Sequence, residues 1–199
     1  MGEVRTAVAS PVRPAADAPV QGRAPSQRRR TARRELRRLR DRDRRSARLA
    51  ELHGLRALVL VARDLVRAGW LQGAWAAYPA EGGATRLVVS SHDLAPGLDE
   101  PVGLCLVGAL VSAGGGPAAA REQPVQRALD LTWHALHGDP AAPVRWCPSP
   151  PERAAHVREL TRWNDEPGRT AADVVNLLDS AEQRAIREIR RYRAAPEPV

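Results

Sequence analysis

The chain has 199 residues, a length that predicts one folded domain with appended segments, and a formal net charge of +8 in which all 31 basic residues are arginine. No stretch approaches the roughly 20 apolar residues of a membrane-spanning helix, and residues 1–20 lack the apolar core of a signal peptide. These features exclude a membrane span and a secretory signal, so we expect a cytoplasmic protein whose Cys105 and Cys147 stay reduced.

Three segments outside the predicted domain differ from it in composition. Residues 1–27 are mostly Pro, Ala, Val and small polar residues without periodicity, which predicts disorder. Residues 28–48 hold twelve arginines against three acids, whereas the rest of the chain is close to neutral. This Arg-rich arm has little apolar face, so we expect a helix there only as an extension of the following helix or on a polyanion. Residues 194–199 are predicted to form a tail.

Residues 49–193 are predicted to form a helical domain that begins with an amphipathic helix. Leucine and valine recur at helical spacing up to Val66, and Gly69 is placed to end the helix. Residues 79–100 are rich in turn-forming residues, with one short strand expected at 86–89.

A buried helix is predicted next. Residues 103–113 are almost all apolar and small, which is typical of a helix buried on all sides, and the glycines at 114–116 end it. Another helix begins near Pro124, since proline is tolerated in the first turn, and ends at Gly138. Residues 139–151 are rich in proline and predict a loop.

The C-terminal part of the domain is predicted to be two helices joined by a turn. The first spans about 151–161, and Pro167-Gly168 provides the turn. Thr170 is placed as the N-cap of the second helix, with Asp173 in the position of a capping-box acid. The second helix runs to about residue 193. The expected fold class is therefore mainly α, a compact bundle of five or six helices around the buried central helix.

Three short motifs give the chain a family resemblance. They are Gly69-Trp70 with Gln72-Gly73, Cys105 to Leu110 with the pattern CxxGAL, and Trp163-Asn164-Asp165 followed by Pro167-Gly168-Arg169-Thr170. Through them, residues 55–185 resemble a family of small actinobacterial and actinophage proteins of unknown function. The resemblance implies a compact helical domain. It implies no activity, cofactor or catalytic residue, and many members lack an Arg-rich arm.

The Arg-rich arm predicts binding to nucleic acid or another polyanion, because arginines neutralise phosphates and release counterions. No aromatic side chain lies among the arginines, so neither base stacking nor sequence-specific readout is expected from the arm alone. The alternative is a solvated tail that meets an acidic protein partner or an anionic membrane surface. The predicted polyanion-binding residues are Arg28, Arg29, Arg30, Arg33, Arg34, Arg37, Arg38, Arg40, Arg44 and Arg45.

Cys105 is the candidate residue for an enzymatic function. A helix N-terminus activates a nearby thiol, and with His92 or His156 and an orienting Asn164 it would make a cysteine-dependent hydrolase or transferase. The alternative is a small side chain used for close packing of the buried helix. We favour a non-enzymatic protein, because nothing in the sequence brings these groups together.

His134 and His137 lie three residues apart on a predicted helix, and Cys105 and Cys147 would complete four zinc ligands. The cysteine spacing matches no short-loop zinc pattern, and histidines near a helix C-terminus also suit the helix dipole. We therefore predict neither a metal site nor a cofactor.

Trp163, Asn164, Asp165 and Arg169 form a candidate ligand-binding corner, with Asp165 and Arg169 as a charged clamp. The alternative, which we favour, is structural. Trp163 would fill the core, Asn164 or Asp165 would cap backbone donors, and Asp165 would pair with Arg169 across the turn. The sequence thus predicts an accessory protein held on a polyanion by its arm, with a domain whose ligand is open.

Overall fold

The structure is a computed structural model that describes residues 25–89, 100–146 and 149–194. The segment 1–27, predicted to be disordered, lies outside the described residues except for 25–27, which belong to a helix. Of the predicted tail, only Ala194 is described.

Helix α1, Pro25–Ala68, contains both the Arg-rich arm and the first predicted helix of the domain. The chain divides into two compact units, residues 1–39 and 40–199. In the first unit, Leu36 and Leu39 are 53% and 48% exposed, so this part of α1 has no buried apolar face. In the second unit, α1 buries Leu52, Leu55, Val59, Ala62 and Val66.

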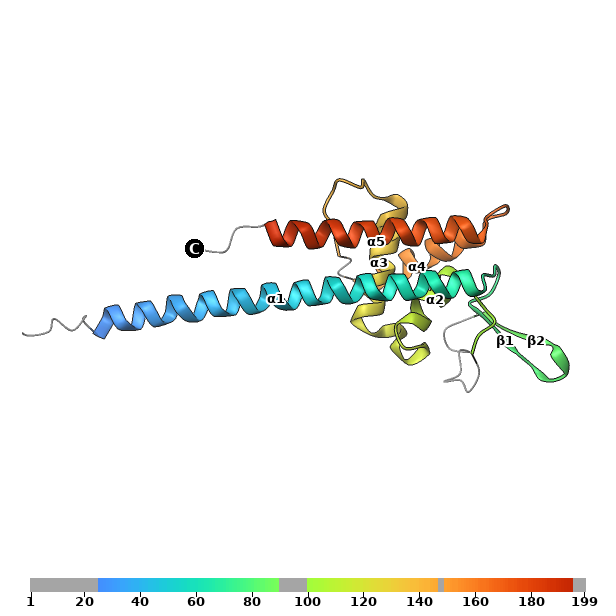
Figure 1. Ribbon diagram of the computed structural model, residues 1–199, viewed down its shortest axis with the longest axis horizontal. Helices are drawn as coiled ribbons and strands as arrows, with labels where there is room; N and C mark the ends of the chain where they lie inside the picture. The colour runs from blue at the N-terminus through green and yellow to red at the C-terminus, as the bar shows by residue number, and fades with distance from the viewer. Residues whose placement is uncertain (1–24, 90–99, 147–148, 195–199) are drawn as a thin grey trace, which may run out of the picture. The chain divides into compact units, whose positions relative to one another are not determined.

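The described residues form five α-helices, which confirms the predicted mainly α fold (Figure 1). The other four are Leu106–Ala113 (α2), Gln123–His137 (α3), Pro150–Asn164 (α4) and Ala171–Ala194 (α5). Every residue from Leu106 to Val111 is buried, so α2 is the predicted buried central helix. It packs against α3 and α4, and α3 in turn packs against α5. Short 3-10 helices occupy Glu81–Gly83 (η1) and Pro117–Arg121 (η2).

A small antiparallel sheet accompanies the helices, with the strand order β2-β1-β3. Its strands are Ala76–Pro79 (β1), Thr85–Val88 (β2) and Gly103–Leu104 (β3). The strand expected at 86–89 corresponds to β2, whereas β1 was not predicted. The prediction that 103 and 104 begin a helix is wrong. Their backbone pairs with β1 instead, and Leu104 N donates to Gly69 O at 2.9 Å.

The N-terminus of α5 is capped as the sequence predicts. Thr170 Oγ1 accepts a hydrogen bond from Asp173 N at 3.2 Å, and Asp173 Oδ2 accepts one from Thr170 N at 2.9 Å. This reciprocal pair is a capping box in which aspartate takes the place of glutamate. No helix in the described parts of the chain is long and apolar enough to cross a membrane.

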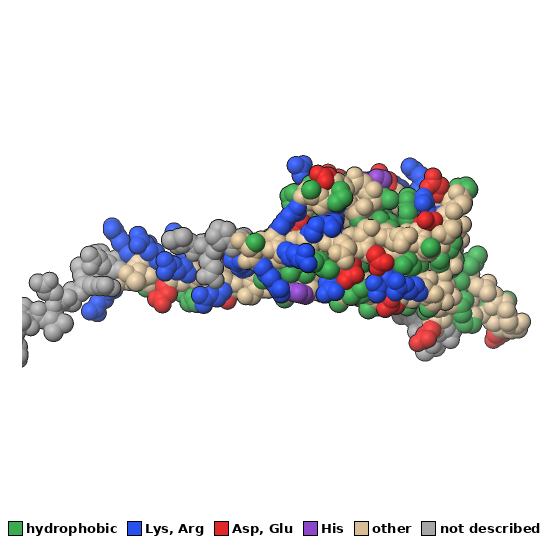
Figure 2. Space-filling model, turned by 45° about the horizontal axis from the view of Figure 1, so that its top comes forward, with side chains coloured by type: hydrophobic (Ala, Val, Ile, Leu, Met, Phe, Trp, Pro, Cys, Tyr) green, Lys and Arg blue, Asp and Glu red, His purple; other side chains and the backbone are tan. Residues whose placement is uncertain are grey.

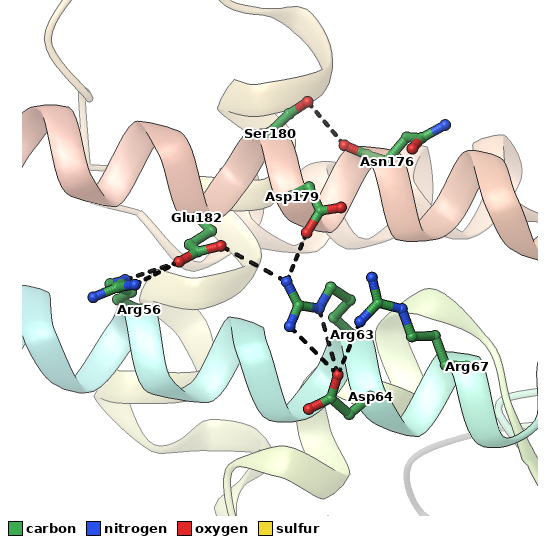
Figure 3. A network of polar contacts seen from close by, with 8 residues as sticks. All are labelled: Arg56, Arg63, Asp64, Arg67, Asn176, Asp179, Ser180 and Glu182. Carbon is green, nitrogen blue, oxygen red and sulfur yellow. Dashed lines mark hydrogen bonds and ion pairs between the residues drawn. The ribbon is translucent and has the colours of Figure 1, made fainter.

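Ion pairs join α1 to α5, which run side by side in opposite directions (Figures 1 and 3). Arg63 NH1 donates to Asp179 Oδ1 at 2.9 Å. About two turns earlier on α1, Arg56 donates to Glu182 Oε1 through Nε at 2.9 Å and NH2 at 2.8 Å. Glu182 is buried, so its pairing with two guanidinium groups offsets the loss of its hydration. These contacts fix the register of α5 along α1.

Two glycine-to-alanine substitutions should have opposite effects on the free energy of unfolding. At Gly108, in α2, an added Cβ would overlap the carbonyl oxygen of Trp75, so Gly108→Ala should destabilise the protein by about 1–3 kcal/mol. At Gly54, in α1, the Cβ would meet nothing within 4 Å, and Gly54→Ala should stabilise it by up to about 1 kcal/mol. Urea unfolding measures both. Shifts of the same sign would contradict this packing of α2.

Candidate functional site

Asn164, at the C-terminal end of α4, is fully buried and joins the segments that carry the three sequence motifs. Its Oδ1 accepts hydrogen bonds from Trp70 Nε1 at 2.9 Å and from Leu106 N at 3.1 Å. Its Nδ2 donates to Leu71 O at 3.2 Å and to Asp165 Oδ1 at 2.8 Å. An amide side chain has two donors and two acceptor lone pairs. All four are used inside the protein, so none is left for a ligand.

The loop after α1 is bound to the turn after α4 by further hydrogen bonds. Gln72 Nε2 donates to the carbonyl oxygens of Asn164 at 2.9 Å and Glu166 at 3.1 Å. Gly73 N donates to Asp165 Oδ1 at 3.0 Å. Asn164 and Asp165 therefore cap backbone and side-chain donors, which supports the structural interpretation of the corner.

Arg169 lies against Trp163 in the same turn. Its guanidinium carbon is 4.0 Å from the Trp163 ring centre, and its Nε donates to Trp163 O at 3.0 Å. It also forms an ion pair with Glu166. The predicted pair between Asp165 and Arg169 is wrong. Arg169 forms its ion pair with Glu166 instead, and the Asp165 carboxylate accepts hydrogen bonds from Gly73 N and Asn164 Nδ2.

Residues 55–184 match the model of a family of unknown function, DUF6197. The chain belongs to this family. Comparison with curated proteins and with solved structures gives no match. All three motifs, and therefore every hydrogen bond of Asn164, lie inside the DUF6197 match. The Arg-rich arm, residues 28–48, lies outside the match.

Within the DUF6197 domain, Cys105 is the N-cap of α2 and is only 1% exposed. Its Sγ accepts a hydrogen bond from Gly108 N at 3.3 Å. Burial raises the pKa of the thiol from 9.0 to about 11, against the weaker opposing effect of backbone hydrogen bonds. A thiol with this pKa is protonated at neutral pH and is a poor nucleophile. The geometry favours capping and packing over catalysis at Cys105.

The groups suggested as catalytic partners of Cys105 have other contacts. The Asn164 amide is saturated as described above, and His156 Nδ1 lies 3.1 Å from Asp130 Oδ1 on α3. His92 lies outside the described residues. The structure thus does not assemble the Cys-His-Asn arrangement from its described members.

An aromatic and histidine cluster lies between α3 and α4. The rings of Trp133 and His156 are stacked, with centroids 3.9 Å apart and planes 10° from parallel. Asp130, whose carboxylate contacts His156, is only 1% exposed. Sequence reasoning missed this group, although an aspartate between the apolar residues Leu129 and Leu131 is a signal for a buried polar partner.

His134 and His137, which were considered as zinc ligands and not predicted to be so, also make contacts within the protein. His134 Nε2 hydrogen-bonds to Arg145 O at 2.5 Å, and burial lowers the pKa of this imidazole. His137 Nε2 lies 3.5 Å from Glu159 Oε2. Cys147 lies outside the described residues. Within the described ranges, no group of three or more His, Cys, Asp or Glu side chains is placed to hold a metal ion.

A pocket of about 720 Å³ lies at the C-terminal ends of α3 and α4, beside the turn that follows α4. Its lining residues are His137, Glu159, Arg162, Trp163, Asp165, Glu166 and Pro167. Two members of the predicted corner, Trp163 and Asp165, thus line a cavity, whereas Asn164 and Arg169 do not. Glu159 and Arg162 were not predicted, because only the packing of α4 beside α3 brings them to the pocket.

Replacing Asn164 should destabilise the domain strongly. Asn164→Ala leaves Trp70 Nε1 and the buried Leu106 N–H without their acceptor, so we expect a loss of about 2–4 kcal/mol in the free energy of unfolding. The matched control is Asn176→Ala on the exposed face of α5, which should change stability by less than about 0.5 kcal/mol. Equal effects in urea unfolding would argue against Asn164 as the polar centre of the fold.

Cys105 should make stability fall at alkaline pH. The folded pKa lies above the unfolded value, so the thiol contributes stability that is fully present below pH 9 and is lost as the pH rises toward 11. The Cys105→Ser variant should not show this loss. Between pH 8 and pH 10, the free energy of unfolding should therefore fall by about 1 kcal/mol more in the protein with Cys105 than in the variant. The tyrosines and arginines are present in both proteins, so their contributions to the pH dependence of stability cancel in the difference. Parallel pH profiles would show that the thiol ionises freely in the folded state.

Proposed function

We propose that this DUF6197 protein is a non-enzymatic accessory protein whose Arg-rich arm binds nucleic acid or another polyanion without sequence specificity. The observation that carries the proposal is the exposure of the arginines on the N-terminal part of α1, where Figure 2 shows them as blue groups with few acids between them. The exposed arginines of the arm are Arg28, Arg29, Arg30, Arg33, Arg34, Arg37, Arg38, Arg40, Arg42 and Arg44.

The spacing of these arginines suits a continuous chain of phosphates. Adjacent pairs recur every four residues at 29–30, 33–34 and 37–38, so they follow one side of the helix with a rise of about 6 Å from pair to pair. Glu35, the acid in this stretch, forms no ion pair with an arginine of residues 28–39. The positive charge of the stripe is therefore available to an anionic partner.

Intramolecular contacts engage the arginines at the C-terminal end of the arm. Arg45 NH2 donates to the carbonyl oxygens of Tyr192 at 2.7 Å and Arg193 at 2.9 Å, at the end of α5. Arg48 donates to Glu51 and its guanidinium carbon lies 4.6 Å from the Trp146 ring centre. We therefore assign Arg45 to holding α5 and place Arg42, which is exposed, in the proposed polyanion-binding set.

A helix that docks into a protein groove uses apolar side chains at i, i+3, i+4 and i+7. The arm offers only Leu36 and Leu39 for such a contact, which favours a phosphate polyanion over an apolar groove. An acidic polypeptide remains the rival partner for the same charges.

Fluorescence anisotropy of labelled duplex DNA and RNA with the full chain tests the arm, using a variant in which four arm arginines become glutamine. The substitutions are Arg33→Gln, Arg34→Gln, Arg37→Gln and Arg38→Gln. Removing four phosphate contacts should reduce the slope of log affinity against log salt by about 3 to 4 for duplex DNA. A competing poly-glutamate chain should not displace the nucleic acid.

A control with the same change in net charge separates the arm from general electrostatics. It replaces four exposed arginines of the domain: Arg121→Gln, Arg158→Gln, Arg162→Gln and Arg190→Gln. The control should keep most of the salt slope. Equal losses in both variants, or no binding near 150 mM salt, would overturn the proposal, and displacement by poly-glutamate would favour the acidic-partner reading.

A further inference from the structure

The pocket at the ends of α3 and α4 has the size of a ligand site. Its volume of about 720 Å³ falls within the roughly 300–1,000 Å³ of small-molecule pockets. One wall is the side chain of Trp163, whose orientation is fixed by the Arg169 guanidinium 4.0 Å from the ring centre. The pocket therefore combines an aromatic wall with charged side chains around it.

Two carboxylates of the pocket are held in place by hydrogen bonds on one oxygen only. Glu159 Oε2 accepts a hydrogen bond from Trp133 Nε1 at 2.5 Å. Asp165 Oδ1 accepts hydrogen bonds from Gly73 N at 3.0 Å and Asn164 Nδ2 at 2.8 Å. In both residues the second oxygen accepts no hydrogen bond from the described part of the chain. These oxygens are preorganised acceptors on side chains that line the cavity.

Other charges near the cavity leave it mildly negative. Glu166 forms an ion pair with Arg169, which leaves Glu159 and Asp165 against Arg162. His137 also lines the cavity, with its Nε2 3.5 Å from Glu159 Oε2. Helices α3 and α4 both end at this pocket, and the C-terminal end of a helix carries a partial negative charge. The carboxylates and the helix C-termini both favour a cation at the same place.

We propose that this pocket binds a cationic nitrogen group, a guanidinium or an ammonium, carried by a small molecule or by an arginine or lysine side chain of a peptide. Glu159 and Asp165 accept the N–H groups of the ligand, and the Trp163 ring contacts its apolar stem. Arg162 opposes this cation, and so limits the affinity. The proposal concerns the DUF6197 domain and is independent of the arm.

Nuclear magnetic resonance titration of the full chain with butylguanidinium, butylammonium and butyrate tests the proposal. The two cations should shift the signals of Trp163, Asp165 and Glu166, and butyrate should not. A blocked peptide, acetyl-Ala-Arg-Ala-amide, distinguishes the sources. Tighter binding of the peptide than of butylguanidinium supports a peptide ligand, and tighter binding of butylguanidinium supports a small molecule.

Substitutions of opposite sign make the test specific. Glu159→Gln and Asp165→Asn keep the hydrogen-bonded oxygen and should each weaken butylguanidinium binding about fivefold, while Arg162→Gln should tighten it by a similar factor. The control is Glu81→Gln in η1, which removes one exposed negative charge elsewhere and should leave the affinity unchanged.

Three results would overturn the proposal: shifts spread over the surface, butyrate binding as tightly as the cations, or weaker cation binding by Arg162→Gln. Because Arg162 is exposed, its variant decides the matter even if an acidic variant fails to fold. The arm variant with four glutamines should keep cation binding. A failure of the pocket proposal can therefore be distinguished from a failure of the proposal for the arm.

Discussion

The buried amide of Asn164 is the constraint on which the rest of the domain depends. It is joined to Trp70, 94 residues away in the sequence, and to Leu106, 58 residues away. A buried donor or acceptor without a partner costs about 1–3 kcal/mol, so the end of α4, the start of α2 and the loop after α1 must meet at this point together. The three sequence motifs are thus three sides of one polar contact.

The arginines of this chain have two kinds of surroundings, depending on their position in the sequence. Within the domain, Arg56 and Arg63 hold α5 to α1, and the buried Arg184 donates to the carbonyl oxygens of Gly138 at 3.4 Å and Asp139 at 2.8 Å. Paired or capping guanidiniums like these contribute to stability and leave little charge for a partner. In residues 28–44 the arginines are exposed, and apart from an exposed ion pair between Arg44 and Asp41 they are not used in this way, so the excess positive charge of the protein is concentrated in this segment.

The hydrogen bonds that join α4 to the loop after α1 also hold a side chain of the proposed cation pocket. One oxygen of Asp165 accepts hydrogen bonds from Gly73 N and Asn164 Nδ2, while the side chain lines the cavity. One oxygen of Glu159, which also lines the cavity, accepts a hydrogen bond from Trp133 Nε1. Carboxylates fixed by the fold lose little conformational freedom when a ligand arrives. Hydrogen bonds that stabilise the fold can therefore also fix side chains that line the proposed cation pocket.

The sequence by itself determined the features that depend on neighbouring residues. Periodicity located the helices, Gly69 and Gly138 marked the ends of two of them, and Thr170 with Asp173 specified a cap. Only the tertiary structure decided that 103 and 104 pair as a strand, that Arg169 takes Glu166 rather than Asp165, and that His156 meets Asp130. The physical reason is that helix formation and capping are satisfied within one or two turns of chain. Strand pairing, ion pairing and pocket walls need partners whose proximity is set by packing of the whole domain.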